Sequence, residues 1–247
     1  MNDKNEGKER LYQKALQHSV SDNANFSKLA ADLAKTGRNL YLRGWVLGTS
    51  GNFSAVSSPK PLRLVISSTG LDKSSLTPAQ FLEIDDNSNV VRGEGCPSAE
   101  ALLHIVVVRC MNAAVVLHTH SVWSTVLSSM HASNGGVTLE GYEMLKGLEG
   151  VRTHQHREWL PILENSIDII ELSQRVCTTL QDSSAIHGFL LRGHGLYTWG
   201  ANLNQAKRHI EILEFLMEVL VRSAEYSHHD GEDNRSSGSR RGRSLWL

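Results

Sequence analysis

The sequence predicts an α/β fold, a single domain in which helices cover a central sheet. A chain of 247 residues is long enough to form one large domain. Short apolar runs rich in β-branched residues alternate with amphipathic stretches, and no linker rich in Pro, Gly or Ser separates them. Interleaved strands and helices of this kind are typical of a sheet with helices packed on it. We therefore expect one core domain over residues 24–226.

The two ends of the chain differ in composition from this core. Residues 1–23 are polar apart from a small apolar cluster, and we expect them to be disordered or loosely helical. Residues 227–247 are rich in Ser, Gly, Asp and Arg and cannot bury enough apolar surface to offset the entropy of ordering. We expect a disordered polar tail there.

The first half of the chain predicts a helix, a strand and a second helix. Apolar residues from 26 to 41 recur near a period of 3.6, which indicates a helix with a candidate break at Gly37. The apolar run at 62–67 indicates a short strand. Ser98 can cap a helix whose apolar residues lie between 101 and 109.

The second half adds two strands and four helices. Apolar runs with β-branched residues indicate strands at 113–118 and 186–191. Asn202 can cap the clearest amphipathic helix, whose apolar face includes Ala206 and Leu220. Three further helical stretches are expected at 121–130, 140–148 and 167–180.

Composition excludes several classes of protein. The 25 Lys and Arg residues balance 26 Asp and Glu residues, for a formal net charge of −1, which argues against binding to nucleic-acid phosphates. The apolar runs are too short to cross a bilayer, and the N-terminus lacks the apolar stretch of a secretory signal. Three cysteines without CxxC spacing do not indicate a disulfide framework. We expect a cytoplasmic protein with neither a nucleic-acid nor a membrane partner.

Two histidines at the end of an apolar strand are the strongest local signal. Alternate residues of a strand share a face, so His118 and His120 point the same way, roughly 6–7 Å apart. In this arrangement the two imidazoles could bind one metal ion together. The alternative is that both are ordinary, partly exposed residues at the end of a strand. His194, between two glycines after another apolar strand, can be a third ligand, and three ligands with an open position are typical of catalytic zinc. His154 and His156 have the same spacing but cationic neighbours, which favour a surface loop.

Two loops are suited to binding an anion. Residues 48–54 and 67–72 are rich in Gly, Ser and Thr, whose backbone amides and hydroxyls can turn toward a phosphate. Neither loop is a Walker or dinucleotide-binding fingerprint, and each alone is more typical of an ordinary turn. Together, beside a metal site, they indicate a small phosphorylated substrate.

Two carboxylates are candidate proton carriers. Glu100 can act as an acid or base, or it can simply favour the N-terminus of its helix through the macrodipole. Glu143 can carry a proton, or it can be an ordinary exposed helix residue. The pattern alone does not decide between these readings.

Taken together, the motifs resemble those of the class II aldolase/adducin family. They occur in that family's order and approximate spacing: GNFS at 51–54, STG at 68–70, PSAE at 97–100, HTHS at 118–121 and RGHGLYTWG at 192–200. The resemblance covers about residues 25–225. Two further stretches, GYEMLKG at 141–147 and LPILEN at 160–165, are similar to segments of the family's dehydratase branch in methionine salvage. Tyr142 departs from that branch, which commonly has Gln there.

The resemblance implies both a fold and a site. The implied fold is a layered α/β/α domain whose central sheet is mostly antiparallel. The resemblance also implies one zinc ion per subunit and family-like homotetramers with sites near subunit contacts. The implied zinc ligands are His118, His120 and His194. The implied substrate-binding residues are Asn52, Thr69, Gly70 and Ser98 in a phosphate pocket, with Cys96 against the substrate.

The reaction implied by the resemblance is dehydration of a small phosphorylated ketose. Glu143 matches the proton carrier of the dehydratases, whereas Glu100 matches the acid/base of the sugar-phosphate aldolases, and we favour Glu143. An aldolase or epimerase acting on another sugar phosphate is the alternative. A non-enzymatic interaction module like the adducin head is a more remote one.

Overall fold

Helices and strands alternate along the chain, as the sequence predicts. The computed structural model describes residues 3–183 and 185–237, with side chains for 22–183 and 185–224. The helices are α1 (Asp3–Leu42), α2 (Ala101–Met111), α3 (Val122–Met130), α4 (Ile169–Asp182) and α5 (Leu203–Ser237). Short 3₁₀ turns are η1 (Lys73–Ser75), η2 (Pro78–Gln80), η3 (Ala132–Asn134) and η4 (Glu143–Gly147). The strands are β1 (Asn52–Pro59), β2 (Leu62–Ser67), β3 (Phe81–Asp85), β4 (Val90–Arg92), β5 (Val115–Thr119), β6 (Gly136–Glu140), β7 (Arg157–Leu163), β8 (Gly188–Leu191) and β9 (Gly195–Gly200).

The strands of the described chain form one sheet in the order β4-β3-β2-β1-β5-β9-β8-β7-β6. Neighbouring strands are antiparallel except β7 and β8, which are parallel, so the predicted mostly antiparallel sheet is confirmed. The register places Asn52 of β1 and Tyr197 of β9 on either side of His118 in β5. Segments far apart in the sequence therefore meet at the end of β5.

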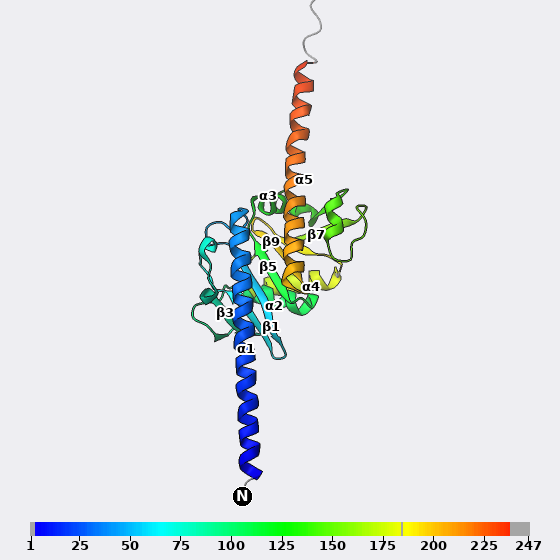
Figure 1. The fold of residues 1–247 in the computed structure, drawn as a ribbon. Helices are drawn as coiled ribbons and strands as arrows, with labels where there is room; N and C mark the ends of the chain where they lie inside the picture. The colour runs from blue at the N-terminus through cyan, green and yellow to red at the C-terminus, as the bar shows by residue number, and fades with distance from the viewer. Residues whose placement is uncertain (1–2, 184, 238–247) are drawn as a thin grey trace, which may run out of the picture.

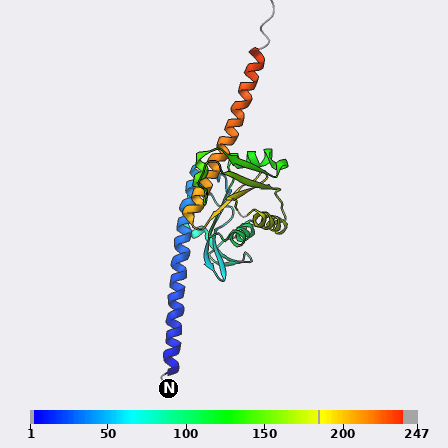
Figure 2. The ribbon, with the colours of Figure 1, turned by 90° about the vertical axis from the view of Figure 1, so that its right-hand side faces the viewer.

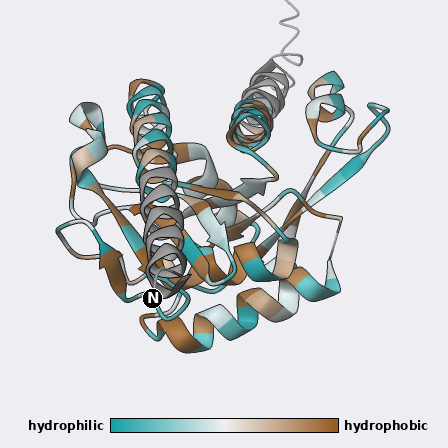
Figure 3. Cartoon of the chain, turned by 60° about the horizontal axis from the view of Figure 1, so that its bottom comes forward, coloured by the Kyte–Doolittle hydropathy of each residue, from teal (hydrophilic) through white to brown (hydrophobic). Residues whose placement is uncertain are grey.

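Helices cover both faces of this sheet, which confirms the predicted α/β/α layers. On one face, α1, α3 and α5 pack over a core that includes Leu33, Leu127 and Leu213. On the other face, α2 and α4 pack over a second core that includes Leu103 and Leu172. Figures 1 and 2 show the two helix layers on opposite sides of the strands. In Figure 3, hydrophobic residues appear both in strands and on the helices that pack against them.

Three predicted element boundaries are wrong. Helix α1 continues through Gly37 without a break. The glycine allows close packing, because a Cβ there would lie 2.6 Å from both Leu76 Cδ1 and Phe53 Cε2. Helix α2 begins at residue 101 with Glu100 at its N-cap, and Ser98 Oγ accepts only from the Glu100 amide, at 3.2 Å. The helix expected at 140–148 is a strand end followed by a 3₁₀ turn.

The two longest helices extend beyond the body of the domain at its opposite ends (Figure 1). The expected domain limits at residues 23/24 and 226/227 fall inside α1 and α5, which are helical from Asp3 and as far as Ser237. The last part of the expected tail, 238–247, lies outside the described residues. The domain limits therefore stay a prediction. Neither of these helices, nor any other in the described ranges, carries an apolar stretch that could span a bilayer.

Candidate metal centre

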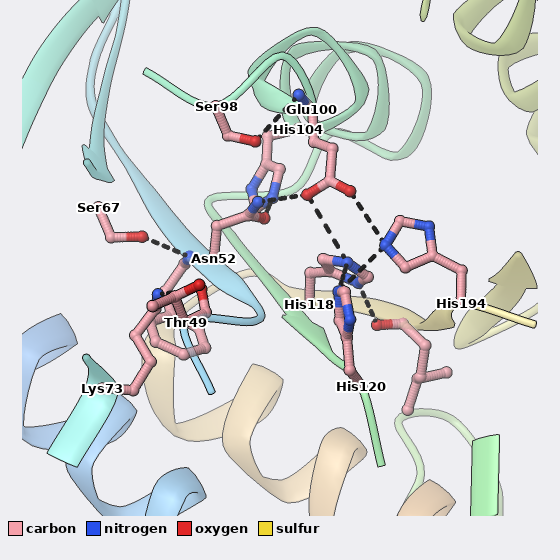
Figure 4. Close-up of polar contacts among 12 residues, drawn as sticks. Thr49, Asn52, Ser67, Lys73, Ser98, Glu100, His104, His118, His120 and His194 are labelled. Atoms are coloured by element: carbon pink, nitrogen blue, oxygen red, sulfur yellow. Dashed lines mark hydrogen bonds and ion pairs between the residues drawn. The ribbon is translucent and has the colours of Figure 1, made fainter. Parts of the chain in front are cut away.

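Three imidazoles converge where β5 and β9 meet (Figure 4). His118 is in β5, His120 lies just beyond that strand, and His194 is in the turn between β8 and β9. The Nε2 atoms of His120 and His118 are 2.8 Å apart, and those of His194 and His120 are 3.0 Å apart. These atoms and a carboxylate oxygen of Glu100 all lie within 4.8 Å of one another. The structure thus brings together the three predicted ligands.

His118 is fixed with its Nε2 atom facing this cluster. The ring is fully buried and its Nδ1 atom donates a hydrogen bond to the carbonyl oxygen of Leu196, at 2.9 Å. The ring also stacks on Tyr197, with 3.8 Å between ring centroids and an interplanar angle of 13°. Because Nδ1 carries the proton, the Nε2 lone pair points at the other two imidazoles.

The short contacts between imidazoles fit a shared metal ion. The Nε2 atom of His120 holds either a proton or a lone pair, so its contacts with His118 and His194 cannot both be hydrogen bonds. A cation at the centre would satisfy all three lone pairs at once. Burial lowers the pKa of His120 to about 4 and lowers the pKa of His118 well below its usual value, so both rings are neutral, the form that binds metal.

Glu100 completes the cluster and is oriented by a chain of polar contacts. Its Oε1 atom lies 3.0 Å from His194 Nε2, and its Oε2 atom accepts from Asn52 Nδ2 at 2.6 Å. Asn52 Oδ1 in turn accepts from His104 Nε2 at 2.5 Å, and His104 Nδ1 accepts from Ser54 Oγ at 2.8 Å. Burial lowers the pKa of His104 to about 4, so this histidine is neutral and each bond in the chain has a defined direction. Burial alone would raise the pKa of Glu100, but its contacts with His194 and Asn52 outweigh it and hold the carboxyl ionised.

A cavity of about 340 Å³ opens beside the imidazoles. Both loops that the sequence suggested for an anion contribute to its wall. The predicted site residues that line it are Asn52, Thr69, Gly70, Ser98, Glu100 and His120. Cys96 does not line it: its side chain is exposed, and its carbonyl oxygen accepts from Ser68 Oγ and the Thr69 amide, both at 3.0 Å. Its predicted contact with the substrate stays a prediction.

The chain does not bring Glu143 to this cavity. The residue lies in η4, where its exposed carboxylate pairs with Lys146 Nζ at 2.6 Å and lies 3.8 Å from His154 Nδ1. Leu145 and Leu148 are buried, so packing anchors the turn. The role predicted for Glu143 therefore stays a prediction and needs a contact that a single chain does not supply.

Two residues of the site were missing from the sequence-based prediction. Lys73 lines the cavity although its side chain is buried, and Tyr197 forms the stacking surface for His118. The only local signal for Lys73 is its place directly after the second glycine-containing loop. Tyr197 lies inside the segment 192–200, and its contact becomes visible only when β9 pairs with β5.

Comparison with known proteins identifies the family of the chain. A sequence model described as Class II Aldolase and Adducin N-terminal domain matches residues 31–221, most of the chain. The chain belongs to the class II aldolase and adducin family. The aldolases of this family are metal-dependent enzymes that process phosphorylated sugars.

Several curated relatives of the chain carry the name methylthioribulose-1-phosphate dehydratase. The protein from Serratia proteamaculans (strain 568) is 42% identical over 177 residues, covering 71% of this chain and 85% of its own. The protein from Pseudomonas syringae pv. syringae (strain B728a) is 41% identical over 196 residues, covering 79% of this chain and 95% of its own. The protein from Methylococcus capsulatus (strain Bath) is 39% identical over 198 residues, covering 80% and 95%.

Solved structures confirm the class II aldolase fold. An L-fuculose 1-phosphate aldolase superposes with a TM-score of 0.67 at 20% identity, covering 81% of this chain and 87% of the other. The corresponding enzyme from Thermus thermophilus gives a TM-score of 0.66 at 23% identity, covering 82% and 98%. At this identity the likeness concerns the fold alone.

The glycine after His194 lets β9 approach the imidazole cluster of this class II aldolase fold. A Cβ at Gly195 would overlap the carbonyl oxygen of Thr119 and lie 3.2 Å from His118 Cε1. We expect Gly195→Ala to destabilise the protein by about 1–3 kcal/mol, the usual cost of overpacking, and to lower its metal content. Thermal unfolding and elemental analysis measure both effects.

Gly150→Ala is a suitable control, because a Cβ there meets nothing within 4 Å although φ is +77°. The control should lose stability only because alanine is strained at this positive φ, and it should keep its metal. Equal metal content in the two variants would show that the close approach at Gly195 does not shape the centre.

Proposed function

We propose that this chain is a dehydratase that converts 5-methylthioribulose 1-phosphate to 2,3-diketo-5-methylthiopentyl 1-phosphate and water, a step of methionine salvage. The observation that supports a metal-dependent reaction is that the Nε2 atoms of His118, His120 and His194 converge beside a cavity. Relatives between 39% and 42% identical that bear the name of this dehydratase support the choice of substrate.

We propose zinc as the metal, one ion per subunit, held by His118, His120 and His194. Imidazole ligands suit zinc, and three of them leave a coordination position open. When bound, the ion supplies Lewis-acid polarisation of the substrate carbonyl.

In this proposal, Glu100 removes the proton from C3 of the substrate. That proton is acidic because C3 is next to the C2 carbonyl. The carboxylate is suited to this step because it lies at the imidazole cluster and is held ionised and oriented by Asn52. The electron pair of the broken C3–H bond forms the C3–C4 double bond as the C4 hydroxyl departs.

Glu143 of the partner subunit protonates the departing C4 hydroxyl, so that it leaves as water. Tautomerisation of the resulting enol, with a proton added at C4, gives the diketone. A second subunit is required in this scheme because η4 is anchored by buried Leu145 and its carboxylate lies outside the cavity of its own chain. We therefore propose a homotetramer, as the family resemblance implies, acting in the cytoplasm.

The substrate phosphate would occupy the cavity beside the imidazoles. Thr69 and Ser98 can offer hydroxyls, and Gly70, at φ +71°, lies in the same wall. The side chain of Asn52 is engaged with Glu100 and His104, which leaves one amide hydrogen for the substrate. The hydrogen bond from the Thr69 amide to the carbonyl oxygen of Cys96 supports a role for Cys96 next to the substrate.

A second candidate function is aldol cleavage or epimerisation of another sugar phosphate. The observation that favours it is the position of Glu100, because this carboxylate reaches the imidazole cluster within one chain whereas Glu143 does not. A metal-free interaction module of the adducin kind is disfavoured by the three converging imidazoles.

Turnover of 5-methylthioribulose 1-phosphate by the zinc-loaded protein tests the proposed function. We expect the diketone to form with loss of one water and no carbon–carbon cleavage. Removal of metal by a chelator should abolish activity, and zinc should restore it; His118→Ala should be inactive even with zinc added. Cleavage of the carbon chain would favour the aldolase, and a protein that binds no metal would favour the interaction module.

A further inference from the structure

Lys73 is a buried cation in the wall of the cavity. Its residue is 1% exposed, and its Nζ atom donates to the carbonyl oxygens of Thr49 and Leu71, both at 3.0 Å. Figure 4 shows Lys73 and Thr49 beside Asn52, next to the imidazole cluster. Burying an ammonium group against neutral carbonyls costs free energy unless an anion accompanies it.

No carboxylate of the described residues pairs with this ammonium. Asp72 is adjacent in sequence, but its side chain caps η1 through the amide and hydroxyl of Ser74, at 2.8 and 2.7 Å. Glu100 is engaged by Asn52 and His194. An ammonium group has three N–H donors, and the described residues accept only two of those of Lys73. Burial lowers the pKa of Lys73 to about 8, so the amine still carries its proton at neutral pH.

A second unpartnered donor lies in the same wall. Ser50 Oγ is buried without a hydrogen-bond partner among the described residues, and Ser50 lines the cavity together with Lys73. A buried hydroxyl without a partner also costs free energy, although less than an uncompensated ammonium does. Both groups would be satisfied by one ligand that offers several acceptor oxygens and negative charge.

We propose that Lys73 binds the phosphate group of the substrate, with Ser50 as a second donor to the same group. A phosphate offers three acceptor oxygens and the negative charge that the buried ammonium lacks, and lysine is a common point-charge ligand for it. The identity of the ketose in this proposal rests on the proposed function. The binding of an anion by Lys73 does not depend on it. This role makes Lys73 the residue that selects phosphorylated over unphosphorylated ketoses.

Replacement of Lys73 by Met tests this role, because Met fills a similar volume without charge. We expect KM for the ketose phosphate to rise between about tenfold and a hundredfold, the range for one charge-assisted hydrogen bond, with a much smaller change in kcat. The dissociation constant of inorganic phosphate, measured by calorimetry on the zinc-loaded protein, should rise by a similar factor. Lys28→Met is the matched control, since Lys28 is exposed and pairs only with Asp32.

The outcomes separate the two hypotheses. Phosphate binding that depends on Lys73 in a protein that does not dehydrate the ketose would support this role and overturn the proposed function. Turnover with unchanged KM and unchanged phosphate affinity in Lys73→Met would support the function and show that Lys73 only links two loops. If Lys73→Met does not fold, Lys73→Gln keeps a donor without the charge, and wild-type phosphate affinity in that variant would overturn the role equally.

Discussion

Replacing Glu143 by Gln is expected to abolish turnover while leaving the metal content near one ion per chain. The Glu143 carboxylate is exposed, and among the described residues it pairs with Lys146 and His154 alone, so its loss removes no buried interaction. Gln keeps the shape of the side chain but cannot deliver a proton to the leaving hydroxyl, and a general acid contributes about 10²–10⁴ in rate. The measurements are kcat, elemental analysis of the metal and thermal unfolding.

Glu140→Gln is the matched control for this variant. Glu140 is an exposed carboxylate three residues away at the end of β6, and it pairs with Arg157 at 2.5 Å. The control should keep wild-type activity. Wild-type kcat in Glu143→Gln would remove Glu143 from the mechanism. Of the two candidate proton carriers, only Glu100 would then remain.

The parts of the fold that follow from local periodicity could be predicted from the sequence. The apolar run before His118 is β5, and the helix capped by Asn202 is α5, where Asn202 Oδ1 accepts from the Gln205 amide at 3.0 Å. Strand β7 could not be predicted in this way. It begins with the polar residues Arg157 and Glu158, and it is a strand because it pairs with β6 on one side and β8 on the other.

The same distinction applies to the site. Strand alternation alone places His118 and His120 on one face, and their Nε2 atoms do meet. The part of the site that the sequence did not show depends on tertiary contacts: His104 orients Asn52 from α2, and Lys73 reaches the cavity from η1. No local sequence pattern shows that His104 will orient Glu100 through the side chain of Asn52. The resemblance to the dehydratases predicts that Glu143 belongs to the site. Within a single chain, however, this residue is exposed and does not line the cavity.

Oligomers mixed from two inactive variants, Glu100→Gln and Glu143→Gln, are expected to regain activity. Glu100 lies among the imidazoles of its own chain, whereas Glu143 would reach the centre only from a neighbour. Each site then needs Glu100 from one subunit and Glu143 from the next. Random mixing of equal amounts in a cyclic oligomer leaves about a quarter of the sites with both carboxylates.

Co-expression of the two variants with different affinity tags isolates these mixed oligomers for a kcat measurement. The control mixes Glu100→Gln with His118→Ala, both of which disable the half of the site that one chain provides. In that mixture every subunit keeps Glu143, but no subunit has both Glu100 and His118, so activity should stay absent. Because both mixtures undergo the same subunit exchange, recovery in the first alone assigns Glu143 to the neighbouring site. Absence of recovery in both would mean that Glu143 does not act across the contact, and the second carboxylate of the reaction would then have to come from within one chain.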